Sequence, residues 1–528
     1  MNTDFDVAIA GAGPVGLLIA NFLGQRGIRT VILEQLPELI DYPRGVGIDD
    51  ETLRTIQAAG LIDSVMEHVT PNQIMHFTSS SGRIFASLQP TTDEFGFPRR
   101  NSFIQPLVDK ALANGLKRFQ GVDLRFGHEL AAFEQDNNRV SIQFAGEQPP
   151  LTARYLVACD GGNSLIRRSL GIEFEGRTAA NRWIVVDIAN DPLGAPDSFL
   201  HGRPSRPYVS IALPHGLRRF EFMLFDGEAP DDVVSDEMLY SLLQPLIARP
   251  DDIDLIRARV YRHNGRLAER FRDGRIILAG DAAHIMPVWQ GQGYNSGVRD
   301  AFNLAWKLAL VVDNKADDGL LDTYGAERRE HARAMISLSE AAGVIFSPTN
   351  RIVAKFRDAL VRLIGIIPSI RSYFLEMRFK PMPRYKEGAL FYPQGYADNS
   401  AVGRMFIQPL VDRAEGPVKL DQVLGNGFAL LAWGVDPRRW LDDQALRIVE
   451  DLGIKIISAV PSTQAAFERK RSDLEIVGDH QGRLKTWFGL QNRAVVLLRP
   501  DRFVAAISSP QEVSHAIKEF ARIASIKL

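Results

Sequence analysis

The amino-acid sequence predicts an α/β protein in which an antiparallel sheet interrupts a parallel one. An apolar strand at residues 6–10 runs directly into a glycine-rich turn and a helix, as in a buried parallel sheet. From Trp183 to about Arg262 the pattern changes to short period-two runs, which are typical of antiparallel strands. Beyond residue 400, short strands and helices alternate again. We therefore expect two interleaved units followed by a smaller one.

The first turn has the spacing of a dinucleotide-binding motif. Gly11 permits a tight turn, Gly13 allows a pyrophosphate to approach the backbone, and Gly16 lets the helix pack closely on the strand. A helix over residues 17–24 and a second strand over residues 30–33 follow. Glu34 ends that strand 23 residues after Gly11, close to the ~20 expected for a ribose-binding acid. The motif indicates FAD or NAD, whereas an ordinary glycine-rich turn is the simpler alternative.

Composition excludes several classes of protein. A length of 528 residues suits two to four domains, and a net charge of −2 without charged blocks disfavours nucleic-acid binding. Cys159 is the single cysteine, so disulfides, a CxxC pair and a multi-cysteine metal site are ruled out, and no metal is expected. No secretory leader and no apolar run of ~18–20 residues is evident, so we expect a cytoplasmic protein without a membrane partner.

The segment before the second junction carries two polar candidates. Arg44 lies in a loop before a helix at residues 51–59, where a role beside the cofactor and an ordinary surface position are equally expected. Two strands within residues 74–88 flank a turn at residues 79–82. Gln105 precedes a helix at residues 107–119, and residues 122–144 alternate as a strand pair.

Two further strand-to-turn junctions follow. A strand at residues 153–158 ends at Asp160-Gly161, where a plain turn is an equal alternative, and Ser164 can cap the next helix. A strand at residues 275–279 ends at Gly280-Asp281. Downstream of it come His284, Pro287, Gly291, Gly293, Tyr294 and Asn295, then a long helix at about residues 297–312.

These patterns predict a domain division. A discontinuous dinucleotide-binding domain comprises residues 1–180 and 263–366, and residues 181–262 form the inserted sheet that floors a substrate cavity. A proline-rich linker spans residues 367–400. Residues 401–528 are compatible with a thioredoxin-like domain, but without cysteine it cannot perform thiol chemistry, so a structural or oligomer-forming role is expected.

Taken together, the junctions at Gly11, Asp160 and Asp281 resemble the class A flavoprotein aromatic hydroxylases. The resemblance implies a Rossmann-like FAD-binding domain in which the first turn and Glu34 hold the ADP half of FAD. It places Asp160 and Gly280 at the middle of the cofactor, with Asp281 on the ribityl chain. It places the remaining candidates near the isoalloxazine ring or elsewhere on FAD: Arg44, Gln105, Pro287, Gly291, Gly293, Tyr294 and Asn295.

The resemblance also implies a reaction. Segments 42–51, 279–297 and 499–507 look like those of family members that hydroxylate 3-(3-hydroxyphenyl)propionate and 3-hydroxycinnamate ortho to the phenol. The expected partners are this small phenolic carboxylic acid, O₂, and NADH or NADPH bound transiently, since a second nucleotide motif is lacking. A related hydroxylase of another phenol or polyketide, and a flavin-binding sensor without turnover, are the alternatives. A homo-oligomer is left open.

Three residues are candidates for catalysis: Tyr208, Arg219 and His284. The substrate is expected between the flavin and the sheet that carries Tyr208, Ser210 and Arg219. Arg219 matches family positions near the active site, although a surface arginine is an equally good interpretation. His284, within the third junction, is another candidate. A phenol needs a base or proton relay, and a buried carboxylate needs a cationic or N–H-rich anchor.

Overall fold

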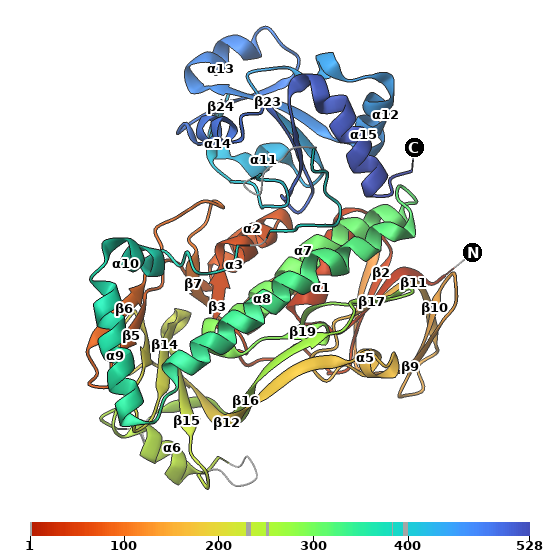
Figure 1. Cartoon of the computed structure of the whole chain (residues 1–528). Coiled ribbons are helices and arrows are strands. Elements are labelled where there is room, and N and C mark those ends of the chain that lie inside the picture. The colour runs from red at the N-terminus through yellow and green to blue at the C-terminus, as the bar shows by residue number, and fades with distance from the viewer. Residues whose placement is uncertain (1–2, 229–233, 250–252, 383, 394–399, 528) are drawn as a thin grey trace.

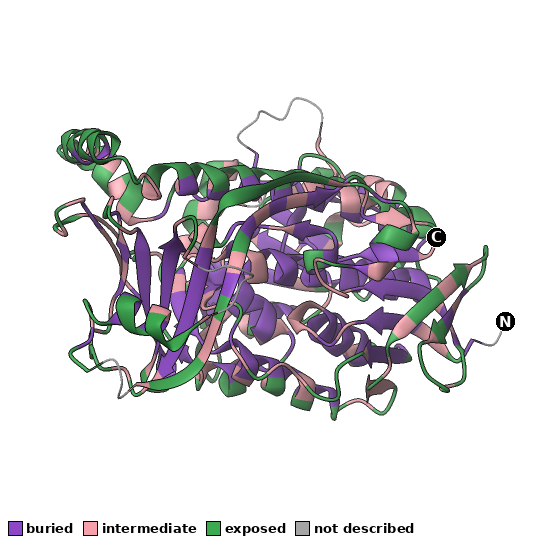
Figure 2. Cartoon of the chain, turned by 90° about the horizontal axis from the view of Figure 1, so that it is seen from below, coloured by how far each residue is buried: buried purple, intermediate pink, exposed green. Residues whose placement is uncertain are grey.

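The computed structural model describes residues 3–228, 234–249, 253–382, 384–393 and 400–527. Two sheets lie below the long helices α7 (Gln292–Val312) and α8 (Asp322–Phe346), and a third sheet forms a separate lobe above them (Figure 1). Most strands are buried, whereas exposed residues lie on the outer helices, in the loops and along the first half of β12 (Phe174–Ala189) (Figure 2). Among the described helices, none combines the length and apolar character needed to cross a bilayer.

The first sheet contains the predicted parallel strands. Its order is β17-β18-β11-β1-β2-β8, and parallel pairs join β8 to β2, β2 to β1, β1 to β11, and β11 to β18. Residues 122–144 form three strands rather than the predicted pair: β8 joins the parallel strands, and the β9–β10 hairpin joins the same sheet through an antiparallel pair of β10 with β11. The bounds are β1 Phe5–Ala10, β2 Thr30–Glu34, β8 Val122–Phe126, β9 Leu130–Gln135, β10 Val140–Phe144, β11 Leu151–Ala158, β17 Arg272–Asp273 and β18 Ile276–Leu278.

The glycine-rich turn joins β1 to α1 (Pro14–Gln25) through close backbone contacts. Gly11 has φ +102°, and a Cβ there would lie 2.4 Å from the carbonyl oxygen of Cys159. A Cβ on Gly16 would lie 2.2 Å from the carbonyl oxygen of Gly11. Both positions therefore require glycine so that strand, turn and helix can pack, as the sequence predicted.

The second sheet is larger than the predicted insertion. Its order is β19-β16-β12-β15-β14-β13-β5-β6, and β5 enters through a parallel pair with β13. Two strands from residues 75–88 thus belong to the substrate-side sheet, and its long strands extend beyond residues 181–262. The bounds are β5 Met75–Thr78, β6 Ile84–Leu88, β12 Phe174–Ala189, β13 Ser198–His201, β14 Tyr208–Leu213, β15 Leu217–Leu224, β16 Asp254–Ala268 and β19 His284–Ile285.

The passage expected to be a linker contains a helix and a buried charge. Helix α10 (Pro368–Leu375) packs beside α9 (Arg351–Gly365). Lys380 lies buried against the start of α2 (Asp50–Ala58), where its ammonium group contacts the carboxylates of Asp49 at 2.7 Å and Glu51 at 3.3 Å. Lys380 therefore holds this segment against α2 through buried ion pairs.

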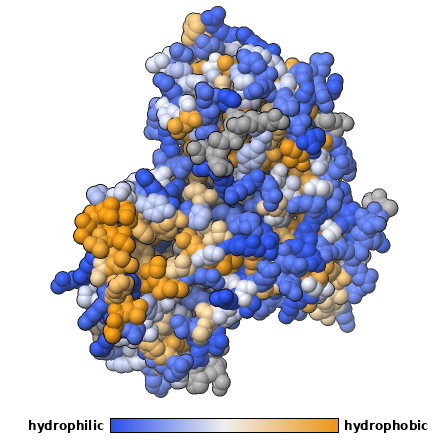
Figure 3. Space-filling view, viewed as in Figure 1, coloured by the Kyte–Doolittle hydropathy of each residue, from blue (hydrophilic) through white to orange (hydrophobic). Residues whose placement is uncertain are grey.

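Helix α9 turns its apolar face outward. Its buried side is polar, because the Arg357 guanidinium donates to the Gly202 carbonyl and the Asp358 carboxylate accepts from the Ser80 N–H. The exposed side forms the hydrophobic patch on the left of Figure 3. We call it the α9 face. It consists of Ile352, Val353, Phe356, Leu360 and Leu363 on α9, with Val344 and Ile345 at the end of α8 and Ile366 just after α9.

The C-terminal lobe holds a seven-stranded sheet of order β21-β20-β24-β23-β22-β25-β26. β22 and β23 are parallel and separated by α12, whereas β25 and β26 are antiparallel and followed by α15. The thioredoxin-like assignment stays a prediction. The bounds are β20 Leu410–Arg413, β21 Gly416–Lys419, β22 Ala429–Trp433, β23 Lys455–Pro461, β24 Glu475–Asp479, β25 Val495–Leu498, β26 Val504–Ser508, α12 Asp443–Leu452 and α15 Val513–Ile523.

Buried ion pairs hold this lobe to the rest of the chain. The Arg499 guanidinium donates to both carboxylate oxygens of Glu327 on α8, each at 2.8 Å, and Lys307 on α7 contacts the same carboxylate at 2.9 Å. Burial alone would raise the pKa of Glu327, but the two cations outweigh it and lower that pKa to about 2. Arg54 on α2 likewise donates twice to Asp421, at 2.7 Å each.

Replacing Glu327 by alanine should lower the free energy of unfolding by about 3–5 kcal/mol, because buried Lys307 loses its counter-charge and Arg499 loses one of its two carboxylate partners. Denaturant unfolding followed by tryptophan fluorescence measures this change. The control is Lys518→Met, which breaks an exposed pair with Asp442 and should leave the unfolding midpoint near that of the wild type. Equal midpoints for all three proteins would contradict the role assigned to Glu327.

Candidate functional site

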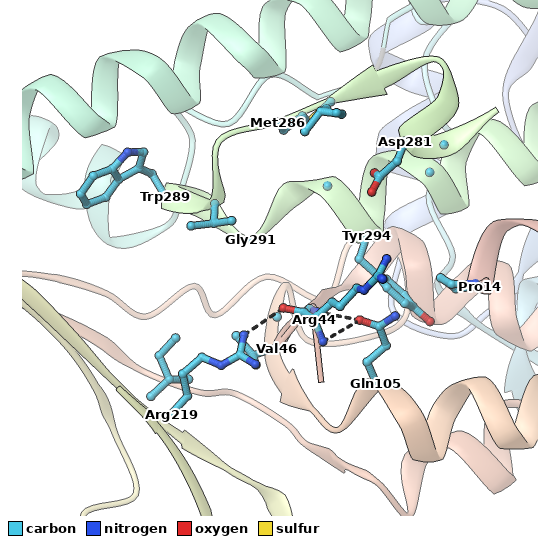
Figure 4. A pocket seen from close by; sticks show the side chains of 18 of the residues that line it. Pro14, Arg44, Val46, Gln105, Arg219, Asp281, Met286, Trp289, Gly291 and Tyr294 are labelled. Atoms are coloured by element: carbon cyan, nitrogen blue, oxygen red, sulfur yellow. Dashed lines mark hydrogen bonds between the residues drawn. The ribbon is translucent and has the colours of Figure 1, made fainter. Parts of the chain in front are cut away.

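One cavity of about 360 Å³ lies where the two large sheets meet. Loops at the carboxyl ends of β1, β11 and β18 line one end, which we call the glycine end. Strands of the second sheet line the other, which we call the sheet end. Figure 4 shows Pro14 and Asp281 at the former and Arg219 and Trp289 at the latter. Ligands of parallel α/β sheets bind outside the carboxyl ends of the strands, so this is the expected place for a cofactor.

The glycine end presents backbone rather than side chains. Gly13 is the N-cap of α1 and Pro14 its first residue, and no side chain caps the free N–H groups there. Glu34 lies beside this turn, since its carboxylate accepts from the Ala12 N–H at 2.8 Å and the Leu36 N–H at 2.9 Å. An uncapped helix start suits a phosphate group, which fits the pyrophosphate of a dinucleotide.

At the second junction, the glycine rather than the acid reaches the cavity. Gly161, with φ +80°, lines it, whereas the Asp160 carboxylate accepts from the Ile166 N–H at the start of α5 (Leu165–Ser169). Burial raises the pKa of Asp160. The junction thus lies beside the cavity, and the carboxylate of Asp160 supports the start of the next helix, so its predicted role beside the cofactor stays a prediction.

The third junction presents Asp281 to the cavity. Its carboxylate is exposed to the cavity and makes no hydrogen bond with any residue that the structure describes (Figure 4). Low-polarity surroundings raise the pKa of Asp281. The turn is held from behind by Asp300, which accepts from the Gly280 N–H at 3.0 Å. Asp281 is therefore placed as an acceptor for the hydroxyl groups of a ligand.

His284 is not part of the cavity wall, which corrects the prediction that it is catalytic. It lies on β19, whose pairing with β16 turns Ile285 toward the cavity and His284 away from it. The His284 Nε2 is 2.7 Å from the Asp300 carboxylate, and the side chain is buried. His284 therefore positions the turn through Asp300.

The start of α7 brings backbone to the centre of the cavity. Gly291, at φ +61°, is the N-cap, so the helix begins at Gln292, five residues before the expected start. Gly291, Gly293 and Tyr294 line the cavity. Pro287 does not line the cavity, whereas its neighbours Met286 and Val288 do.

Asn295 and Gln105 hold these segments in place. The Asn295 side chain accepts from the Asp49 N–H at 3.0 Å and donates to the Gly291 carbonyl at 2.9 Å, so it positions the helix start without lining the cavity. The Gln105 amide oxygen, at the start of α4 (Gln105–Leu116), accepts from the N–H groups of Arg44 and Gly45. Both Gln105 and Arg44 line the cavity (Figure 4), and their predicted contact with the cofactor stays a prediction.

The sheet end presents one face of the second sheet. Val209 pairs with Glu221 and Ile211 with Arg219, and all four line the cavity. Tyr208 and Ser210 point to the opposite face, where the Tyr208 ring stacks on His201 and Phe222. The prediction that Tyr208 and Ser210 face the substrate is therefore wrong, because alternate residues of a strand point to opposite faces.

Arg219 lines the cavity, but its charge is already matched. Its guanidinium donates to the Asp187 carboxylate at 2.7 and 2.9 Å. It also donates to the carbonyl oxygens of Pro43 and Arg44, at 2.5 and 2.9 Å, which ties β15 to the Arg44 loop (Figure 4). Arg219 is thus a positioning residue rather than a free cation.

Several polar and aromatic residues of the sheet end were not predicted from the sequence. Glu221 is buried, its pKa is raised by burial, and it accepts from the Tyr261 hydroxyl at 2.8 Å. His263 is neutral at pH 7, because burial lowers its pKa to about 4, and its buried Nε2 has no partner among the described residues. The His263 ring stacks on Trp289, and Trp183 meets both rings edge-on. Strand alternation from Arg219 would have identified Glu221.

The only acidic cluster of metal-binding geometry found among the described residues is Asp49, Asp50 and Glu51, and cations already surround it. Arg299 contacts Asp49 at 2.6 Å and Glu51 at 2.7 Å, Lys380 contacts both, and Arg99 contacts Asp50. Burial would raise the pKa of Asp49, but Lys380 and Arg299 hold it below its usual value. The cluster therefore serves to join α2, α7 and the segment after α10.

Known proteins match the chain along its whole length. Residues 4–339 match the family model described as FAD binding domain, and residues 403–523 match the HcaD C-terminal domain. The 3-(3-hydroxy-phenyl)propionate/3-hydroxycinnamic acid hydroxylase of Comamonas testosteroni is 50% identical, covering 98% of this chain and 97% of its own. The protein of the same name from Escherichia coli O8 (strain IAI1) is 51% identical, covering 100% and 96%.

Solved structures share the fold. The flavin-dependent monooxygenase PieE, in complex with FAD and substrate, matches with a TM-score of 0.81 at 22% identity, covering 99% of this chain and 100% of its own. Aklavinone-11 hydroxylase with FAD and aklavinone matches with a TM-score of 0.80 at 23% identity, covering 99% of each chain. The chain therefore belongs to the class A FAD-dependent aromatic hydroxylases, the family that the sequence indicated, and its cofactor is FAD.

Proposed function

We propose that the chain hydroxylates 3-(3-hydroxyphenyl)propionate, and also 3-hydroxycinnamate, ortho to the phenol hydroxyl to give the 2,3-dihydroxy acid. The observation that carries this proposal is about 50% identity, over almost the entire chain, to relatives named for these two acids. NADH is the proposed electron donor and O₂ the oxidant, with NADPH as the alternative donor. A cavity that joins a dinucleotide-type end to an aromatic-lined end supports the assignment.

We propose that the glycine end holds FAD. The turn with Gly11, Gly13 and Gly16 together with Glu34 would bind the ADP half, and Asp281 would accept from the ribityl hydroxyls. Gly291, Gly293 and Tyr294 would lie against the ring, where the first turn of α7 offers N–H groups and a positive dipole end. Bound FAD supplies the redox and oxygen chemistry.

The sheet end is the proposed site of the phenol. Val209, Ile211 and Trp289 would cover the aromatic ring and exclude water. The carboxylate of Glu221, whose pKa is raised, would accept the phenol proton. The Nδ1 of neutral His263 accepts from the Val288 N–H, so its Nε2–H would donate to the phenolate oxygen. Withdrawal of that proton makes the ortho carbon electron-rich, which is the requirement of the reaction. Arg219 and Asp187 would fix the wall on which Glu221 lies.

We also propose that two copies associate through the α9 face. Its side chains expose on the order of 1,000 Å² of apolar surface, comparable with the ~800 Å² per partner of a standard interface. The inward side of α9 is polar, so the helix does not use its apolar residues within its own chain. A cytoplasmic location, proposed from the single cysteine, is compatible with such an assembly.

Asp281→Ala should weaken FAD binding about 10- to 100-fold, because the ribityl hydroxyls lose a charged acceptor. Flavin fluorescence released on dilution measures the dissociation constant. Asp63→Ala, at an exposed acid on the short helix α3 (Ile62–Met66), is the control and should retain FAD like the wild type. Unchanged retention in Asp281→Ala would remove this residue from the cofactor site.

The wild type, supplied with FAD, NADH and either acid in air, should form the 2,3-dihydroxy product in step with NADH oxidation. Product identification by mass spectrometry, with peroxide measured in parallel, checks the coupling. If both acids cause only peroxide release while another phenol is hydroxylated, the substrate assignment is wrong and the enzyme class stands. If no phenol is hydroxylated, the alternative of a flavin-binding sensor gains support.

Light scattering should give the molar mass of a dimer for the wild type and of a monomer for the double variant Phe356→Glu, Leu363→Glu. Charges placed in the α9 face make its burial unfavourable. Leu490→Glu, at an equally exposed leucine of the C-terminal lobe, should remain dimeric. A wild type that stays monomeric, or that binds vesicles through this face instead, would contradict the proposal.

A further inference from the structure

Arg100 is a cation of the sheet end that has no counter-ion among the residues that the structure describes. It begins β7 (Arg100–Phe103) and lines the sheet end together with Gln73 and Met75. Its carbonyl accepts from the Gln73 N–H, and the Gln73 side chain donates to the Ala212 carbonyl on β14. Arg100 therefore lies beside β14, on the side of the cavity away from β16, which carries His263.

The guanidinium of Arg100 makes no ion pair with any residue that the structure describes, and its buried Nε has no hydrogen-bond partner. The adjacent Arg99 differs, because it contacts both Asp50 and Glu94. Arg219, the other arginine at this end, is matched by Asp187. Burial lowers the pKa of Arg100 to about 10, so the group remains charged at neutral pH.

A buried charge without a partner is unfavourable, so this position is suited to a ligand that brings an anion. A guanidinium matches a carboxylate in shape, since it can donate two parallel hydrogen bonds. The acidic groups of the cavity do not satisfy it: Glu221 interacts with Arg219 and Tyr261, and Asp281 lies at the glycine end. No acidic residue that the structure describes therefore supplies the anion, and a bound ligand would supply it.

We propose that Arg100 binds the carboxylate of the substrate and so forms the acid-selective part of the site. This inference rests on the proposed function, which supplies a phenol that carries a short acid side chain. β14 and β16 are separated by β15 and β12, which makes three strand spacings or roughly 14 Å. An arginine side chain together with an extended phenolic acid spans this width, so the phenol would reach Glu221 and His263 while the acid contacts Arg100.

The test compares the acid with its uncharged amide, 3-(3-hydroxyphenyl)propanamide, which has nearly the same shape. Dissociation constants are measured on the FAD-loaded protein, without NADH, from the change in flavin absorbance. The wild type should prefer the acid. Arg100→Gln should weaken acid binding about 10- to 100-fold and leave amide binding within about twofold, because only the charged hydrogen bonds are lost.

Two further variants complete the design. Arg100→Lys keeps the charge but not the planar fork, so it should restore part of the preference for the acid. Arg168→Gln removes an exposed arginine and controls for net charge, with no change expected for either ligand. FAD content and thermal midpoint verify folding, and if Arg100→Gln fails to fold, the acid-to-amide ratios of the wild type and Arg100→Lys decide.

Equal weakening of acid and amide in Arg100→Gln, an unchanged constant for the acid, or a wild type without preference would each overturn the proposal. So would a variant whose only defect is a raised KM for NADH, because the anion would then belong to the nicotinamide nucleotide. A wild type that prefers the acid but does not hydroxylate it refutes the proposed function and leaves the anchor standing. Hydroxylation without acid preference refutes the anchor alone.

Discussion

The carboxylate of Asp300 is the point on which the cavity depends. It is fully buried on α7 and accepts from the Gly280 N–H, from His284 Nε2 and from the Arg328 guanidinium on α8. Burial would raise the pKa of Asp300, but the charges of His284 and Arg328 hold it below its usual value. One side chain thus fixes the third turn against both long helices, and that turn presents Asp281 to the cavity. A satisfied network of this kind rigidifies its surroundings, whereas loss of one member leaves buried charge unpaired.

Buried polar contacts also connect the C-terminal lobe to the site. No described residue beyond 400 lines the cavity, yet Arg54 on α2 is paired with Asp421 of that lobe. Asp49 and Thr52, at the start of the same helix, bond to Asn295, which holds the first turn of α7. The lobe therefore supports the site through α2.

The sequence predicted the features that depend on local spacing. The turn at Gly11–Gly16 and the end of β2 at Glu34 follow from short-range geometry, and both occur as expected. Features that depend on partners distant in sequence were not predictable. Both faces of β14 are buried, so the pattern around Tyr208 could not show which face meets the cavity. The sequence made His284 and Arg219 candidates for catalysis, because it does not show that His284 binds Asp300 and that Arg219 binds Asp187. That Arg100 has no counter-ion among the described residues is likewise evident only in the folded chain.

The proposed reaction inserts one atom of O₂ into the ring of a phenolic acid. The most direct measurement is the isotopic content of the product formed from 3-(3-hydroxyphenyl)propionate under O₂ labelled with the heavy oxygen isotope. We expect one labelled oxygen atom in the new hydroxyl group and none from the solvent. A product that carries solvent oxygen, or labelled peroxide as the sole product while NADH is consumed, would contradict the account.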